Sequence, residues 1–112
     1  MSRTIRVLWR GASTGWKNFN WGGVIDAQSV VHISASEGVL QDSNTPISGS
    51  PLDIIGRHRG EAPIYVKDVR PHPDDGGGGG VEFYLQVDWD TPLDVVTDIT
   101  VVDPPEEGVI VG

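Results

Sequence analysis

The sequence contains no cysteine, which excludes disulfide bonds and thiolate metal ligands. It also lacks any apolar run near the roughly 20 residues that a membrane-spanning helix requires. The basic N-terminus is not followed by the apolar stretch of about 7–15 residues that defines a secretory signal peptide. We therefore expect a soluble protein that is cytoplasmic or is released without a conventional signal peptide.

Basic residues are the next scarce group. The chain has 8 Lys and Arg against 16 Asp and Glu, a formal charge of −8. Because nucleic acids and anionic membranes are bound through basic faces, neither is an expected partner. All eight basic residues lie within residues 1–70, whereas residues 71–112 carry ten acidic residues and no basic one.

The acidic residues of the second part stand among Val, Ile, Phe and Trp, unlike those of a disordered acidic tail. We therefore predict that they lie on strands. Arg3, Arg6 and Arg10 lie on or beside the first apolar run, so we predict that this run lies near the acidic C-terminal strands, within one chain or between subunits. Exposed ion pairs contribute only about 0–1 kcal/mol each, so they would guide strand register and partner choice more than stability.

Leu and Ala, which favour helices, are few. Together they number 9, whereas Val and Ile number 24, and 15 Gly and 8 Pro interrupt the chain. Branched side chains pack well on a pleated surface, and 112 residues suit one domain. We predict an all-β fold over residues 1–112: a single antiparallel β-sandwich of Greek-key or jelly-roll type with about seven or eight strands. A small β-barrel is the second choice.

Alternating apolar and polar side chains mark the strands. Residues 81–89 alternate strictly, and residues 93–102 place Val95, Thr97, Ile99 and Val101 on one face. The short turn between these runs predicts that they pair as a hairpin. Six further runs complete the count, at residues 5–9, 24–35, 38–41, 52–55, 64–69 and 109–111.

Two segments stand apart from the predicted strands. Residues 71–80 end in five consecutive glycines, which predicts a flexible hairpin tip. Residues 103–112 read as a C-terminal arm in which two prolines precede the apolar residues Val109, Ile110 and Val111. Because exposed branched residues at a free edge promote pairing, this short strand should dock on its own sheet or on a second subunit, which makes self-association an expectation.

The best candidate site is the glycine-rich segment of residues 11–23, which we interpret as a loop between strands. It holds Trp16, Lys17, Asn18, Phe19, Asn20 and Trp21. An indole can stack on the apolar face of a sugar, and Asn amides both donate to and accept from hydroxyls. The segment therefore predicts a site for a glycan or another small polar ligand, although the same aromatic residues could instead turn inward and close one end of the fold.

A second candidate is the acidic cluster of Asp88, Asp90 and Asp94. Carboxylate oxygens at the end of a sandwich can hold Ca²⁺, the one cofactor that we consider, but the spacing of glycine and glutamate does not match an EF-hand. A solvated acidic face is the simpler interpretation.

Three classes of function stay open. The first, which we favour, is a non-catalytic, lectin-like module that binds carbohydrate. The second is a structural protein that forms homo-oligomers by exchange of edge strands or arms. The third is a small β-barrel enzyme with an apolar cavity lined by Trp9, His32, Tyr84 and Trp89. The sequence has neither a nucleophile elbow nor an opposed pair of carboxylates, which disfavours an enzyme.

Overall fold

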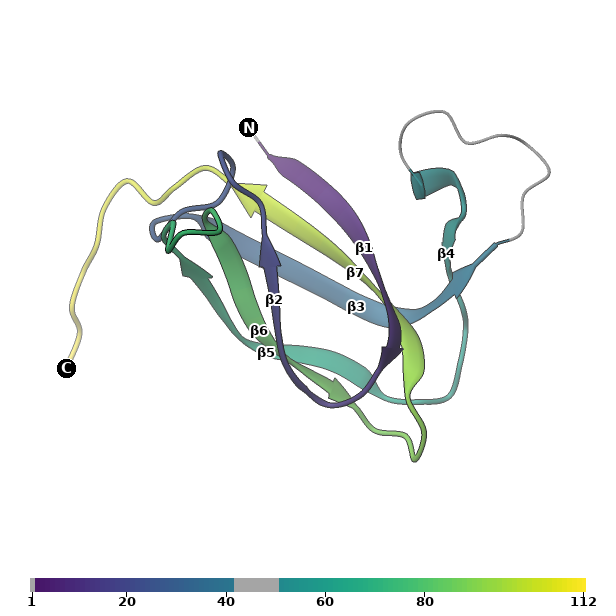
Figure 1. The fold of residues 1–112 in the computed structure, drawn as a ribbon. Coiled ribbons are helices and arrows are strands. Elements are labelled where there is room, and N and C mark those ends of the chain that lie inside the picture. The colour runs from purple at the N-terminus through teal and green to yellow at the C-terminus, as the bar shows by residue number, and fades with distance from the viewer. Residues whose placement is uncertain (1, 42–50) are drawn as a thin grey trace.

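The chain folds into strands that form two antiparallel sheets (Figure 1). The computed structural model describes residues 2–41 and 51–112, and in this part of the chain there is no α-helix. One sheet has the strand order β1-β7-β3-β4, the other has the order β2-β6-β5, and one of the two curls into a half-barrel. The strands are β1 (Arg3–Ala12), β2 (Gly15–Asn20), β3 (Val30–Leu40), β4 (Ile55–Arg57), β5 (Ile64–His72), β6 (Gly80–Val87) and β7 (Leu93–Val102).

The all-β prediction is therefore confirmed. The only helical turn among the described residues is a 3₁₀ turn, η1 (Pro51–Asp53). Within residues 2–41 and 51–112, no helix has the length and apolar character needed to cross a membrane.

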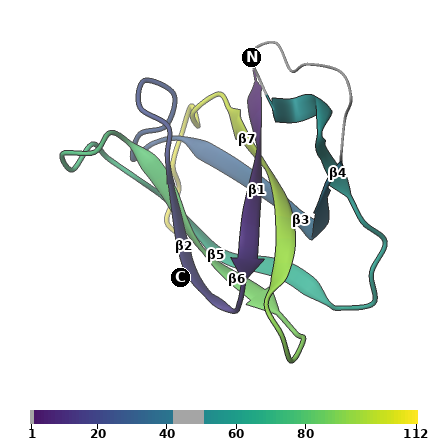
Figure 2. The ribbon, with the colours of Figure 1, turned by 45° about the vertical axis from the view of Figure 1, so that its right-hand side comes forward.

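The predicted hairpin between the strands β6 and β7 is wrong. β6 pairs with β2 and β5, whereas β7 pairs with β1 and β3. β7 is a central strand with a partner on each side, so its backbone has no free edge for β6. The turn at residues 88–92 instead carries the chain from one sheet to the other, as Figure 2 shows.

The connection from β1 to β2 also passes between the sheets. Hydrogen bonds hold it to the end of β6 and to the start of β7. The Thr14 hydroxyl accepts a hydrogen bond from the Val87 amide at 2.9 Å and lies 3.2 Å from the Val87 carbonyl oxygen. The Gly11 amide donates to Asp94 Oδ1 at 2.9 Å. Gly11 has φ of +59° at the irregularity between Trp9 and Ala12, a conformation that glycine adopts without steric cost.

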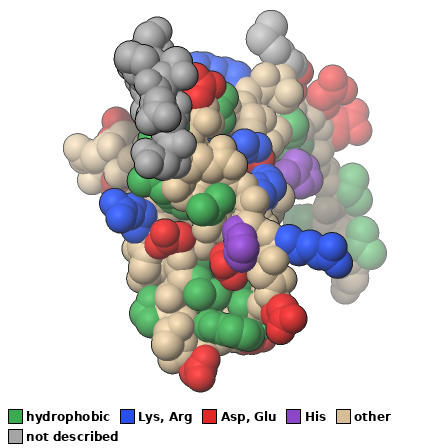
Figure 3. All heavy atoms as spheres, turned by 90° about the vertical axis from the view of Figure 1, so that its right-hand side faces the viewer, with side chains coloured by type: hydrophobic (Ala, Val, Ile, Leu, Met, Phe, Trp, Pro, Cys, Tyr) green, Lys and Arg blue, Asp and Glu red, His purple; other side chains and the backbone are tan. Residues whose placement is uncertain are grey.

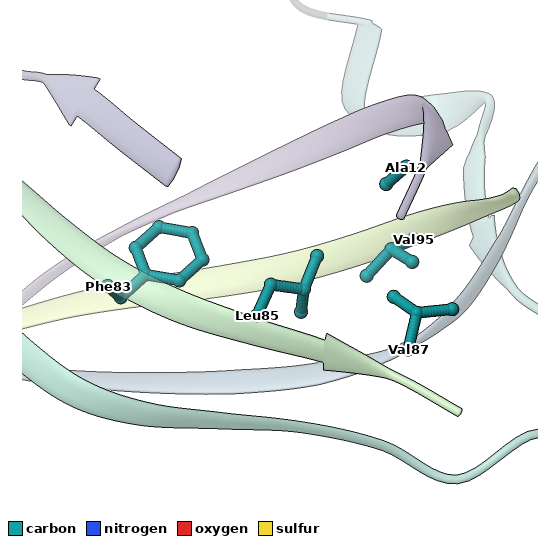
Figure 4. Packing of buried hydrophobic residues seen from close by; sticks show 5 residues of the cluster. All are labelled: Ala12, Phe83, Leu85, Val87 and Val95. Carbon is teal, nitrogen blue, oxygen red and sulfur yellow. The ribbon is translucent and has the colours of Figure 1, made fainter. Parts of the chain in front are cut away.

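The core lies between the two sheets, where these two connections bring β6 to face β7. Phe83, Leu85 and Val87 of β6 pack with Val95 of β7 and with Ala12 (Figure 4). All five side chains are buried, and the Trp9 ring meets Phe83 edge-on at 5.8 Å between centroids. A second buried cluster continues the core with Ile25, Val81, Ile99 and Val101.

The predicted approach of the arginine-bearing strand to the acidic strands is confirmed, because β1 pairs with β7. Arg6 donates to both carboxylate oxygens of Asp98, at 2.7 and 2.9 Å, and Arg57 of β4 donates to Asp98 at 2.5 Å. Hydrogen bonding from Arg6, aided by Arg57, holds the pKa of Asp98 below its ordinary value and raises the pKa of Arg6. Figure 3 shows acidic and basic side chains interspersed on the face at the right of Figure 1.

Four predicted strands differ most from the structure. No strand covers residues 52–55, because residues 51–53 form the 3₁₀ turn η1 and β4 begins only at Ile55. β3 begins at Val30 rather than at Val24, because residues 21–25 form a turn closed by hydrogen bonds to the Trp21 carbonyl oxygen. Residues 38–41 do not form a separate strand, since β3 continues to Leu40. Residues 109–111 are not a strand, and the arm formed by residues 103–112 runs away from the sheets (Figure 1).

Candidate functional site

Most of the segment predicted as a binding loop, residues 11–23, is not a loop: residues 11 and 12 end β1 and residues 15–20 form β2. The aromatic and Asn residues of β2 alternate with a period of two. In β2, Trp16 is 58% exposed, and Asn18 and Asn20 are also exposed. Phe19 points the other way, against the core. The alternation therefore divides the six predicted residues between the two faces of one sheet.

The other two predicted residues do not join the exposed row. Lys17 is half-buried on the face opposite to Trp16. Trp21, just beyond the strand, packs against the core, and the Arg3 guanidinium lies 5.3 Å from its ring centroid.

Strand pairing adds side chains that sequence reasoning did not assign to the site. We call the side of the β2-β6-β5 sheet that faces away from the core the outer face. On β2 it carries Trp16, Asn18 and Asn20, on β6 Glu82 and Tyr84, and on β5 Lys67, Arg70 and His72.

An aromatic cluster occupies one row of the outer face. Trp16 is directly opposite Tyr84 in the ladder, and their rings meet edge to face, 5.5 Å apart at 85°. Lys67, opposite Tyr84 on its other side, places Nζ 5.0 Å from the centre of the Tyr84 ring. These contacts orient Tyr84 from both sides and leave more than half of Trp16 open to solvent.

A polar row lies next to the aromatic row. Asn18, Glu82 and Arg70 are neighbours across the three strands, and Arg70 Nη1 donates to Glu82 Oε1 at 2.6 Å. Asn18 Nδ2 donates to Asn20 Oδ1 at 2.8 Å. Each of these side chains has more donors or acceptors than these bonds use, so the row can also bind a ligand.

His72 connects the two outer strands of this sheet across β6. The residue is only 7% exposed, with Nε2 2.8 Å from Asn18 Oδ1 and Nδ1 2.9 Å from the Pro73 carbonyl oxygen. β2 and β5 are two strand spacings apart, about 9.6 Å. His72 can reach Asn18 because its ladder partner on β6 is Gly80, which has no side chain in the way.

A hollow of about 350 Å³ opens beside this polar row, lined by Asn18, Asn20, Arg70, His72, Pro73, Asp75 and Glu82. Its size falls at the lower end of the range of about 300–1,000 Å³ that is usual for small-molecule sites. Asp74 fixes the adjoining connection, since its Oδ1 accepts from the Gly76 and Gly78 amides at 2.9 and 3.1 Å. The same bonds lower the pKa of Asp74.

The predicted hairpin tip therefore has defined contacts near the hollow. Pro71 and His72 belong to β5 and Gly80 to β6, so the connection comprises residues 73–79. The Trp21 amide donates to the Gly79 carbonyl oxygen at 2.8 Å, which links the connection to the end of β2. Its flexibility in solution stays a prediction.

The fold does not bring the three proposed calcium ligands close together. Asp94 accepts from the Gly11 amide, and Asp88 accepts from Gln86 Nε2 at 2.5 Å, while Asp90 is exposed on the turn. Within residues 2–41 and 51–112, no three His, Cys, Asp or Glu side chains are placed to hold a metal ion. Calcium binding stays a prediction for which the described residues offer no assembled donor set.

The four residues proposed to line an enzyme cavity are likewise separated. Trp9 packs in the core and donates from Nε1 to Thr97 Oγ1 at 2.9 Å. Tyr84 lies on the outer face, His32 is exposed on β3, and Trp89 follows the end of β6 with 48% of its surface exposed.

Comparisons of the chain with protein-family models, curated proteins and solved structures found no match. Function is therefore inferred from the outer face itself.

Proposed function

We propose that the outer face binds carbohydrate and does not transform it. The observation that carries this proposal is an exposed indole, Trp16, on the same face as a hollow lined by amide, guanidinium and carboxylate groups. A sugar ring presents an apolar C–H face together with a rim of hydroxyl groups. Trp16 supplies the apolar surface, and Asn18, Asn20 and Arg70 supply hydrogen bonds to the rim.

The charges of the hollow favour a polar ligand of low net charge. Arg70 is paired with Glu82, and Asp75 is the other carboxylate in the lining. A phosphate-rich ligand would require an excess of basic groups, which this lining does not have. An apolar ligand would remove water from the exposed amides of Asn18 and Asn20 without replacing its hydrogen bonds.

The carboxylates also support a binding role rather than glycoside hydrolysis. Hydrolysis requires one carboxyl group that protonates the leaving oxygen and a second that acts across the cleft. Here Glu82 is held by Arg70 at 2.6 Å, and Asp75 lies on the exposed connection after β5. The neighbouring strand β2 contributes no carboxylate to the lining.

A glycan array followed by titration of intrinsic fluorescence tests the proposal, with Trp16→Ala as the variant and Trp89→Ala as its matched control. Both indoles are about half exposed, at 58% and 48%, but only Trp16 belongs to the outer face. We expect Trp16→Ala to weaken binding by about tenfold, which corresponds to roughly 1.4 kcal/mol, and Trp89→Ala to leave it unchanged. Equal loss in both variants, or no bound glycan, would contradict the proposal.

We also infer that the two sheets close as a sandwich rather than as a barrel. What supports this is that, among the described residues, each ladder joins strands of one sheet only. The side chains of β6 and β7 meet face to face in the core, which is how packed sheets bury their inner surfaces.

A further inference from the structure

The arm formed by residues 103–112 carries three apolar side chains that have no cover. Val109 is 83% exposed, Ile110 is 100% exposed and Val111 is 91% exposed. These residues do not dock on a sheet of their own chain, because the arm extends away from both sheets (Figure 1). Two prolines near the start of the arm, Pro104 and Pro105, lie between β7 and these apolar residues and restrict the path of the chain.

The outer edge of β1 is the longest regular free edge among the described strands. β1 ends the order β1-β7-β3-β4, and its pairing with β7 is regular from Arg3 to Trp9. The other edges are less suitable: β4 has three residues, β5 is interrupted near Asp68 at φ of +55° and contains Pro71, and β2 carries the outer-face Asn residues. Ile5, Val7 and Trp9 face the core, yet each is only half-buried at this open edge.

We propose that residues 107–111 of one copy add as an antiparallel strand to the outer edge of β1 in a second copy. The proposal is independent of carbohydrate binding. A free edge strand offers unpaired main-chain donors and acceptors to which an extended segment can add by hydrogen bonds. The second copy, rather than another partner, is indicated by the match of charge and side-chain pattern between the two segments.

One antiparallel register matches both the alternation of apolar side chains and the charges of the two segments. Placing Ile110 opposite Val7 extends the row of side chains that faces the core. The same register places Val109 opposite Leu8 and Glu107 opposite Arg10 on the other face. Arg10 is exposed, and no ion-pair partner for it occurs within the described part of the chain.

The arm cannot reach this register on its own chain. β7 ends at Val102, next to the start of β1, because Val101 pairs with Arg3. The path from Arg3 to Arg10 along β1 is about 23 Å, whereas the chain from Asp103 to Glu107 spans at most about 14 Å. The occupant must therefore come from a second molecule, and reciprocal exchange of two arms closes a dimer.

Sedimentation equilibrium of the full chain tests the proposal, with Ile110→Asp as the disrupting variant. Ile110 is fully exposed in the single chain, so the substitution removes no contact within the fold. We expect the wild-type mass to rise above the monomer value of 12.0 kDa with concentration, and Ile110→Asp to stay at that value. A wild-type monomer up to its solubility limit, or association that survives Ile110→Asp, would overturn the proposal.

Charge reversal tests the register itself. We expect Arg10→Glu and Glu107→Arg each to weaken association about two- to fivefold, as for a cross-strand ion pair, and the double variant to recover most of it. Glu106→Arg is the matched control, because it makes the same charge change at the residue just before the added strand, which has no basic partner in this register. This register would be refuted if Glu106→Arg restored the association of Arg10→Glu as fully as Glu107→Arg does.

Discussion

Asp98→Asn is the substitution whose effect can be worked out most fully from the structure. The carboxylate is 19% exposed and receives two hydrogen bonds from Arg6 and one from Arg57. The Arg57 side chain is 39% exposed, so solvent screens it and it contributes only about a few tenths of a kcal/mol. The bidentate, less exposed Arg6 contact accounts for most of an expected loss of about 1–2 kcal/mol near neutral pH.

The loss should depend on pH with a definite sign. The pKa of Asp98 is lowered on folding, so its stabilising contribution is complete above the ordinary carboxyl pKa. That contribution is lost as pH falls through the lowered value. The amide of the variant does not titrate, and carboxylates common to both proteins cancel in the difference. The stability gap between wild type and Asp98→Asn should therefore shrink towards zero in strong acid.

Urea unfolding near pH 7 and near pH 2 measures this gap directly. Asp90→Asn is the control, because Asp90 is exposed on the turn after β6 and should change stability by less than about 0.5 kcal/mol. An Asp98→Asn protein as stable as wild type near pH 7 would refute the reasoning. So would a gap of the same size at both pH values.

Three further predictions concern packing, a buried hydrogen bond and metal binding. Gly80→Ala should lower stability by about 1–3 kcal/mol, because its methyl group would lie 2.5 Å from the Phe19 carbonyl oxygen. Thermal melting checks this, with Gly108→Ala as the control, because the site of Gly108 is open. Trp9→Phe should cost about 1–3 kcal/mol in urea unfolding, since Thr97 is fully buried and loses its donor. Millimolar Ca²⁺ should leave the melting temperature unchanged, because Asp88, Asp90 and Asp94 form no common donor set in the described structure; a clear rise would establish the calcium site.

The strands were predictable where one face is apolar and the other polar. Val81, Phe83 and Leu85 are all fully buried, as their alternation in the sequence indicates. The approach of the arginine-bearing strand β1 to the acidic strand β7 was likewise predictable, because charges of opposite sign are concentrated in separate parts of the chain. Both signals are local or depend on composition, so neither requires knowledge of the sheet order.

The partner of each strand was not predictable in the same way. A short turn after β6 is compatible with a hairpin or with a passage between sheets. Which of the two forms depends on β1 and β3 occupying both edges of β7. The evidence for that arrangement is spread over strands that lie far apart in the sequence.

The candidate site was likewise predictable within one strand but not across strands. The alternation of Trp16, Asn18 and Asn20 with Lys17 and Phe19 was present in the sequence, and it could have identified β2 as a strand. The outward direction of Glu82 follows from the alternation in β6, but its place beside Asn18 depends on the pairing of β6 with β2. Arg70 and His72 could not have been foreseen, because the irregularity between Lys67 and Arg70 sets which side chains of β5 face outward.

Carbohydrate binding by the outer face is tested at residue level by an NMR titration of the labelled protein with a glycan that the array identifies. We expect shift changes concentrated at the Trp16 indole and at the amides of Asn18, Asn20 and Tyr84. Residues around Trp89 and in the second hollow beside Arg3 and Val24 should not shift. Changes centred on either of those places, with β2 and β6 unaffected, would contradict the assignment of the outer face as the binding surface.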